Sequence, residues 1–229
     1  MLFRSIFIFC LFVFTTPLWA GEPVTERLAC PVGGEKFKIT GTLSCSTLGR
    51  TMSMRPITSC DFITRLPVCP SNGLPVYQKF STEQVEILER FVDTDDYKAI
   101  GTLPPWQRAY GIAKYLDQSG TKVAFGLLLK AFWYETAPLL QNSAAMDQFL
   151  GEAEAELRRA PDADRPFLNA LLAYALFAAG RTQEAEHNLQ HAKTAPNIPE
   201  SLQQYISAIE GCKTKMASAG CLPDAPLDP

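Results

Sequence analysis

The stretch FLNALLAYALFAAGRTQEAEHNLQHA, residues 167–192, decides the fold. Its apolar residues recur three and four positions apart on both sides of Gly180, which is the spacing of an amphipathic helix. A glycine turn at the break lets the chain reverse its direction. The stretch therefore predicts two antiparallel helices that pack face to face, with the rest of the helical part stacked on them.

Small and large side chains follow one another in this pair as they do in a tetratricopeptide unit. In such a unit, small residues admit the neighbouring helices and a proline ends the second helix. Ala173, Gly180 and Ala185 fit that order, and Pro196 falls near the terminating proline. A second pair surrounds Gly120, sixty residues earlier, which is not a whole multiple of one unit. We therefore predict an irregular tetratricopeptide-like array with one good repeat.

Other helices are signalled by their first residues. Ser81-Thr82-Glu83-Gln84 has the form of a capping box, and Pro104-Pro105 suits the start of a second helix. Pro199 opens a last helix that covers the end of the stack. The remaining helical segments are predicted at residues 123–135 and 144–160.

The first twenty residues have the order of a secretory signal peptide. Arg4 precedes an apolar run from Ser5 to Phe14, and Leu18-Trp19-Ala20 ends in a small residue before Gly21. The run is shorter than the roughly 20 apolar residues that a membrane-spanning helix needs. We therefore expect cleavage after Ala20, no integral membrane segment afterwards, and an exported protein that is periplasmic or extracellular.

Charge and composition exclude some partners. The chain is 47% hydrophobic and 20% charged, as in ordinary globular proteins, and without Arg4 it has 20 basic and 24 acidic residues. A net charge of about −4 provides no overall electrostatic attraction for nucleic acid or anionic lipid. We therefore expect no nucleic-acid partner.

Loss of the leader removes Cys10 and leaves six cysteines, an even number that favours disulfides in an oxidising compartment. Cys212 and Cys221 follow the last helix closely and are predicted to pair, fastening the C-terminal tail. Beyond Ala217 this tail is rich in proline, and we expect it to be mobile. The other four are Cys30, Cys45, Cys60 and Cys69.

The segment before the helices changes to strand periodicity. In KFKITGTL, residues 36–43, the side chains of Phe37, Ile39 and Leu43 fall on one side of a strand. Frequent glycine and proline predict short strands and turns. The fold is then mainly α, with a small disulfide-tied β/loop module before a tetratricopeptide-like array. The divisions are 1–20 (signal peptide), 21–80 (module), 81–211 (helical domain) and 212–229 (tail).

Two segments of this module, CPVGGEKF from Cys30 and LPVCPSNG from Leu66, resemble zinc-ribbon knuckles of the form Cys-Pro-x-Cys-Gly. Gly33 and Asn72 stand where the second cysteine of each knuckle would be. From Leu28 onward the chain resembles an uncharacterised bacterial family that has two such knuckles followed by tetratricopeptide-like helices. The resemblance implies a divergent exported branch and a periplasmic location, and it implies no activity.

The resemblance also bears on how the front cysteines pair. Because the two knuckles of a zinc ribbon meet, it implies a Cys30–Cys69 bridge with Cys45–Cys60 nested inside it. The alternative is that these four thiols hold one zinc ion or form a thiol-redox module. Half of the knuckle ligands are missing, however, and the chain has no Cys-x-x-Cys dithiol. We favour disulfides and expect no metal or other cofactor.

Residues suited to catalysis are few. His187 and His191 lie four positions apart and, with Glu184, could hold a transition metal, but the helical pattern places them on the solvent side. The chain has no Gly-x-Ser-x-Gly elbow and no phosphate-binding glycine loop. Carboxylate pairs such as Glu152 with Glu154 are interpreted as solvated helix faces.

Large aromatic residues are the best candidates for a partner groove on the concave face of the array. They are Trp106, Tyr110, Trp133 and Tyr134. The sequence thus predicts a non-enzymatic exported protein whose helical array binds a protein or peptide. The alternative function is metal binding or thiol redox chemistry at the four front cysteines.

Overall fold

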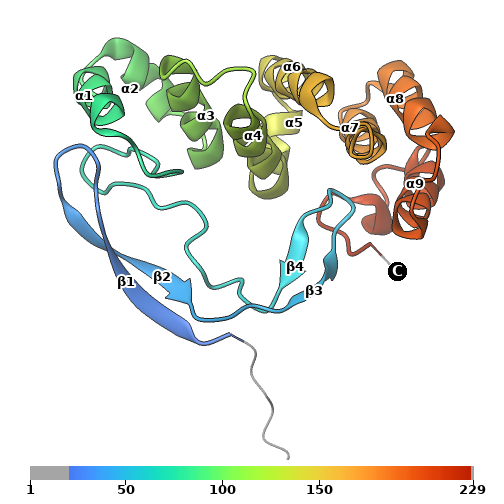
Figure 1. The fold of residues 1–229 in the computed structure, drawn as a ribbon, viewed down its shortest axis with the longest axis horizontal. Coiled ribbons are helices and arrows are strands. Elements are labelled where there is room, and N and C mark those ends of the chain that lie inside the picture. The colour runs from blue at the N-terminus through green and yellow to red at the C-terminus, as the bar shows by residue number, and fades with distance from the viewer. Residues whose placement is uncertain (1–20, 228–229) are drawn as a thin grey trace, which may run out of the picture.

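The computed structural model describes residues 21–227, so the predicted signal peptide lies outside the described residues. Figure 1 shows the helices in a curved row, with two β hairpins arching beneath it from the first helix to the last. The protein is mainly α with a small β region at its front, as predicted. The strands are β1 (Pro23–Ala29), β2 (Lys36–Thr42), β3 (Thr47–Arg50) and β4 (Pro56–Thr58). The helices are α1 (Thr82–Phe91), α2 (Asp95–Gly101), α3 (Pro105–Tyr115), α4 (Lys122–Tyr134), α5 (Thr136–Leu140), α6 (Ser143–Arg159), α7 (Arg165–Ala178), α8 (Thr182–Thr194) and α9 (Glu200–Cys212).

The helical pair around Gly180 is confirmed as α7 and α8. Gly180 has a φ of +76°, which is the left-handed conformation that ends a helix and that glycine adopts without strain. Every residue of α7 from Ala170 to Phe177 is buried, whereas α8 buries only Ala185, Leu189 and Ala192. The first helix is therefore central and the second covers it. Membership of a tetratricopeptide class stays a prediction.

The start of α1 is stabilised by the predicted capping box, whereas the start of α3 is stabilised by a residue far away in the sequence. Ser81 and Gln84 form the reciprocal capping box at α1. The start of α3 has no local side-chain cap; instead, the Glu135 carboxylate accepts hydrogen bonds from the backbone N–H groups of Trp106 (2.6 Å) and Gln107 (3.1 Å). Burial raises the pKa of Glu135, and these two bonds oppose that rise. The end of α4 thus holds the start of α3.

Two short helices, α2 and α5, were not predicted. The acidic cluster at Asp95 and Asp96 occupies the first turn of α2, where a helix dipole favours negative charge. Thr94 caps this helix by accepting a hydrogen bond from the Tyr97 N–H. Helix α5 follows α4 directly.

The interpretation of Glu152 as a solvated residue was wrong. Its side chain in α6 is only 5% exposed, and it accepts hydrogen bonds from the Tyr110 hydroxyl (3.1 Å) and the Gly120 N–H (2.7 Å). The turn between α3 and α4 packs against α6, and a polar group buried between them needs a hydrogen-bond partner. Glu152 supplies that partner and so stabilises the fold.

The N-terminal module, residues 21–80, consists of two separate antiparallel hairpins, β1–β2 and β3–β4. The three predicted disulfides, Cys30–Cys69, Cys45–Cys60 and Cys212–Cys221, are all present. Thiols that are joined in disulfides cannot ligate zinc, so the structure does not support the zinc alternative for the front cysteines.

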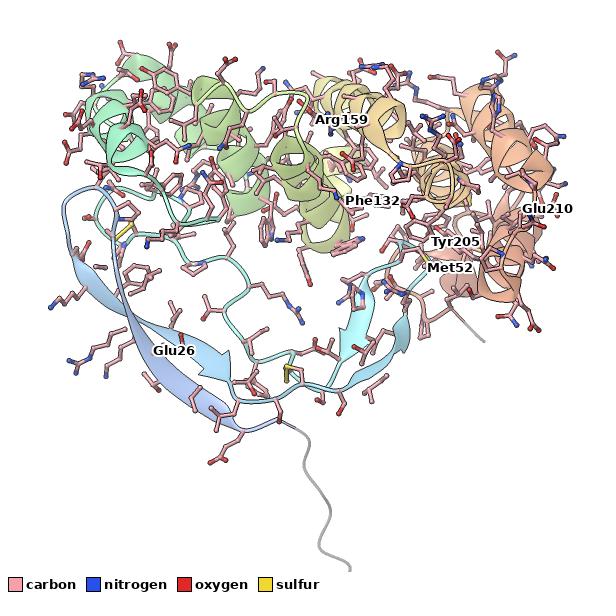
Figure 2. All side chains as sticks on the ribbon, viewed as in Figure 1. Glu26, Met52, Phe132, Arg159, Tyr205 and Glu210 are labelled. Atoms are coloured by element: carbon pink, nitrogen blue, oxygen red, sulfur yellow. A yellow bond between two sulfur atoms is a disulfide. The ribbon has the colours of Figure 1, made fainter. Side chains whose placement is uncertain are left out.

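The module is attached to both ends of the helical row. At one end Cys30 and Cys69 are buried in a cluster with Leu88, Phe91 and Ile112. At the other end the turn after β3 enters the main core, where Met52 is 2% exposed. Figure 2 shows Met52 beside Tyr205 of α9, and the Tyr205 hydroxyl donates to the Met52 carbonyl (2.9 Å).

The C-terminal tail is held in place as far as Leu227, so the expectation of a mobile tail was wrong for its described part. Backbone hydrogen bonds join it to the turn after β3, from Met52 N to Ala225 O (2.9 Å), and to the last residue of β3, from Leu227 N to Arg50 O (2.8 Å). Tyr174 of α7 adds a hydrogen bond to the Cys221 carbonyl (2.7 Å). The proline-rich sequence suits this extended pairing because few of its N–H groups need partners.

Candidate functional site

Two of the four aromatic residues of the predicted groove contact the N-terminal module, and the other two are buried in the helical array. Trp106 and Tyr110 are buried, at 5% and 6% exposure. The Trp133 indole N–H donates to the Ser53 carbonyl (2.8 Å), and the Arg65 guanidinium lies 5.0 Å from the centre of the Tyr134 ring. None of the four lines the cavities described below. That these four residues line a groove for a partner therefore stays a prediction, because they border none of these cavities.

The two histidines are exposed on α8, as the helical pattern indicates. Their Nε2 atoms lie 3.2 Å apart, but the Glu184 carboxylate is engaged by Arg181 at 2.7 Å. Among residues 21–227, no three side chains of His, Cys, Asp or Glu gather as metal ligands.

A candidate site consists of two adjoining cavities, which we call the Phe167 groove. Phe167, Ser201 and Leu202 line both cavities, so they lie next to each other. The first cavity, about 690 Å³, lies between β3 and α9. The second, about 610 Å³, lies where the end of α6 meets the starts of α7 and α9. Tyr205 and Arg159, which line the first and second cavities respectively, are labelled in Figure 2.

The first cavity is apolar with one basic group. Leu202 and Tyr205 are buried in its wall, and burial raises the pKa of Tyr205 well above its usual value, so this phenol is neutral at physiological pH. Leu48 of β3 is 69% exposed and supplies an apolar rim. Arg50, the single charged residue of the lining, donates to the Met54 carbonyl (3.1 Å).

The second cavity has a charged rim. Glu156 is buried and forms an ion pair with Arg159 across one turn of α6. Lys122 and Asp164 add one charge of each sign. An apolar floor with a few charged groups at its edge binds side chains and fixes their orientation.

The lining of the groove contains Lys122, Glu156, Asp164 and Ser201, and it contains no histidine or cysteine among the described residues. The buried carboxylates elsewhere are engaged, Glu135 by the start of α3 and Glu152 by Tyr110 and Gly120.

Sequence reasoning missed this groove because its walls are far apart in the chain. Phe167 was recognised as the beginning of the central helix pair, but β3 comes more than a hundred residues before it. Only the docking of Met52 beside α9 brings the two together. No local pattern in the sequence indicates this region, because the 69% exposure of Leu48 in β3 is visible only in the structure.

No protein-family model matches the chain, and no significant match is found among curated proteins or solved structures. The resemblance drawn from the two knuckles therefore stays an expectation. No helix within residues 21–227 combines the length and the apolar character needed to cross a bilayer.

Proposed function

We propose that this is an exported, non-enzymatic protein that binds an extended peptide segment of a partner in the Phe167 groove. The observation that carries the proposal is the pair of adjoining cavities, about 690 and 610 Å³, which together have room for several side chains. The three disulfides are compatible with an oxidising compartment.

The lining indicates the chemistry of the segment. The first cavity suits one bulky apolar side chain, because its wall is formed by Phe167, Leu202 and Tyr205. Arg50 at the same cavity favours an acidic residue beside that apolar one. The second cavity has two charges of each sign and supplies no further preference for charge.

The test is selection of a random peptide library on the purified protein, followed by affinity measurement with the enriched peptides. Leu48→Ser removes an apolar side chain from the rim at little cost to the fold, because Leu48 is already 69% exposed. We expect affinity to fall about tenfold or more, corresponding to at least ~1.4 kcal/mol. Leu222→Ser, also at an exposed leucine (41%) but outside the groove, is the matched control.

Two results would contradict the proposal. One is the absence of any enriched peptide. The other is a set of peptides whose binding is equally reduced by Leu222→Ser and Leu48→Ser, since binding would then not involve the groove. Hydrogen exchange with and without peptide provides the independent readout, with protection expected at β3 and the start of α9.

A further inference from the structure

The exposed face of α8 carries both histidines of the chain, His187 and His191. Residues four positions apart on a helix are neighbours on one face. The two rings also turn toward each other, since their Nε2 atoms lie 3.2 Å apart and their planes are inclined by 80°. The outermost nitrogen of each ring is therefore brought to the same place beside the helix, which the spacing in the sequence allows but does not require.

The distance between the two nitrogens matches that between two ligands of one metal ion. A tetrahedral zinc ion, with bonds of about 2.0 to 2.1 Å to each imidazole nitrogen, places those nitrogens about 3.3 Å apart. The observed 3.2 Å is close to this value. A hydrogen bond between the rings gives a similar distance, but it joins them through a single proton, which a metal ion replaces. The pair can therefore accept such an ion with only a small movement of the rings.

No other charged group occupies the two imidazoles in the described part of the chain. Within residues 21–227 neither ring forms an ion pair. The neighbouring carboxylates are engaged elsewhere, Glu184 by Arg181 (2.7 Å) and Glu186 by Lys213 (3.0 Å). Among the same residues, no third side chain of a usual ligand type joins the pair. A metal ion here has two protein ligands, and its other coordination positions are open to water.

Helix α8 holds the two ligands at a fixed spacing. Ala185, Leu189 and Ala192 lie on its other face and are buried in the main core. A ligand pair on a helix that is fixed in this way is organised before the ion arrives, which favours binding. His191 also lies in the last turn of the helix, where the negative end of the helix dipole favours a cation.

The surroundings attract cations, and the imidazoles select among them. Residues 81–229 contain 13 basic and 20 acidic residues, a net charge of −7. Imidazole suits zinc, copper and nickel, whereas calcium and magnesium take oxygen ligands. The six cysteines within residues 21–227 are joined in disulfides and do not compete for the ion. The chemistry of the pair therefore favours transition metals over the alkaline earths.

We propose that His187 and His191 together bind a divalent transition-metal ion and exchange it with the solvent. The distance fits zinc, and copper(II) binds more tightly by the general order of affinities. Structural zinc sites have four protein ligands, so an ion held by two is released readily. Exposure, which argued against a structural metal here, is what an exchangeable site requires. Figure 1 shows α8 at the end of the helical row, on the side away from the hairpins.

The test is isothermal titration calorimetry of the untagged protein, purified with its disulfides intact and freed of metal by a chelator. We expect one zinc ion per chain, tighter binding of copper(II) and no saturable binding of magnesium. His191→Gln should lower the affinity for zinc at least tenfold, because a second ligand on the same helix acts at a high effective concentration. Glu186→Gln, the control on the same helix, removes a neighbouring charge and should leave the affinity within about twofold.

A rescue variant separates chelation from a structural role of the second histidine. Gln183 is exposed and lies four positions before His187. His191→Gln combined with Gln183→His restores the spacing of four on α8, and it should regain most of the lost affinity.

The absence of saturable zinc and copper(II) binding would overturn the proposal. So would zinc binding that His191→Gln leaves unchanged, failure of the rescue variant, or equal affinity for magnesium. These substitutions are at exposed positions, so all variants should keep the melting temperature of the unaltered protein. No residue of α8 lines the Phe167 groove, so none of these outcomes depends on peptide binding there.

Discussion

The helical array and the N-terminal module are stabilised by different forces. The array buries large side chains completely, among them Phe132, Phe149 and Tyr174. None of the four strands of the module contains a buried residue. Two disulfides, a small buried cluster shared with α1 and α3, and hydrogen bonds to the array stabilise the module. The difference teaches that the module depends on the array for its shape, whereas the array depends on its own packing.

The largest expected effect tests the array through its buried tyrosines. Burial raises the pKa of Tyr110, Tyr174 and Tyr205, so the folded state keeps these phenols protonated while the unfolded state loses their protons near pH 10. Unfolding is therefore favoured as the pH rises above 10. At pH 11 the loss is roughly 1.4 kcal/mol for each, or about 4 kcal/mol in total. Urea unfolding at pH 8 and pH 11 measures it. Tyrosinate absorbance from all three at pH 10 with an intact fold would contradict this prediction.

The next effect tests the module through its longer disulfide. Cys30→Ala with Cys69→Ala removes a link between residues 39 apart, and we expect a loss of about 3 to 4 kcal/mol on the chain-entropy argument. Hydrogen exchange should increase in β1 and β2 more than in α7. Cys212→Ala with Cys221→Ala, whose loop spans only nine residues, is the control and should cost less. An equal increase in exchange throughout the array would show that the two regions are not stabilised separately.

A smaller effect tests the junction of the two regions. Tyr205→Phe removes the hydroxyl that donates to the buried Met52 carbonyl, and it should cost about 1 to 2 kcal/mol because that carbonyl loses its partner. Faster amide exchange at Met52 and Ser53, whose N–H groups bond the tail, is the specific readout. Tyr115→Phe, at a tyrosine that is 46% exposed, is the control and should change neither stability nor exchange there.

The smallest effect concerns the side chains that join the middle of the module to the array. Arg65 lies over the ring of Tyr134 and forms an ion pair with Asp61, which is 75% exposed. Arg65→Ala should cost less than about 1 kcal/mol, because contacts with exposed partners contribute little. A loss above about 2 kcal/mol in thermal unfolding would mean that this contact holds the module as firmly as the Tyr205 junction does.

Much of the array could be predicted from the sequence because its signals are local. Ser81, Pro105 and Gly180 mark helix starts and a turn through their own backbone chemistry, and the structure places them as expected. Helix α2 was missed because an acidic cluster suits both a break and a first helical turn. The buried position of Glu152 depends on how α6 packs on the turn at Gly120, which no local pattern contains.

The candidate site was much less predictable. Disulfide partners followed from cysteine spacing and from the likeness of two turns to knuckles, and all three bridges are present. The Phe167 groove, in contrast, requires β3 to meet α9, and their residues are more than 150 positions apart. Trp106 and Tyr110 were predicted to line a groove only because they are aromatic, but both are buried. A sequence does not distinguish an aromatic residue of the core from one of a groove.

The junction at Met52 has a mechanical consequence for the whole molecule. A helical array with open ends flexes along its length, because each unit touches only its neighbours. Here the segment from Cys30 to Met52 spans from the start of the array to its end and is fixed at both places. The curvature of the array is thereby set, and so is the width of the Phe167 groove. A segment that enters it meets a preformed surface, so little of its binding free energy is lost in reshaping the protein.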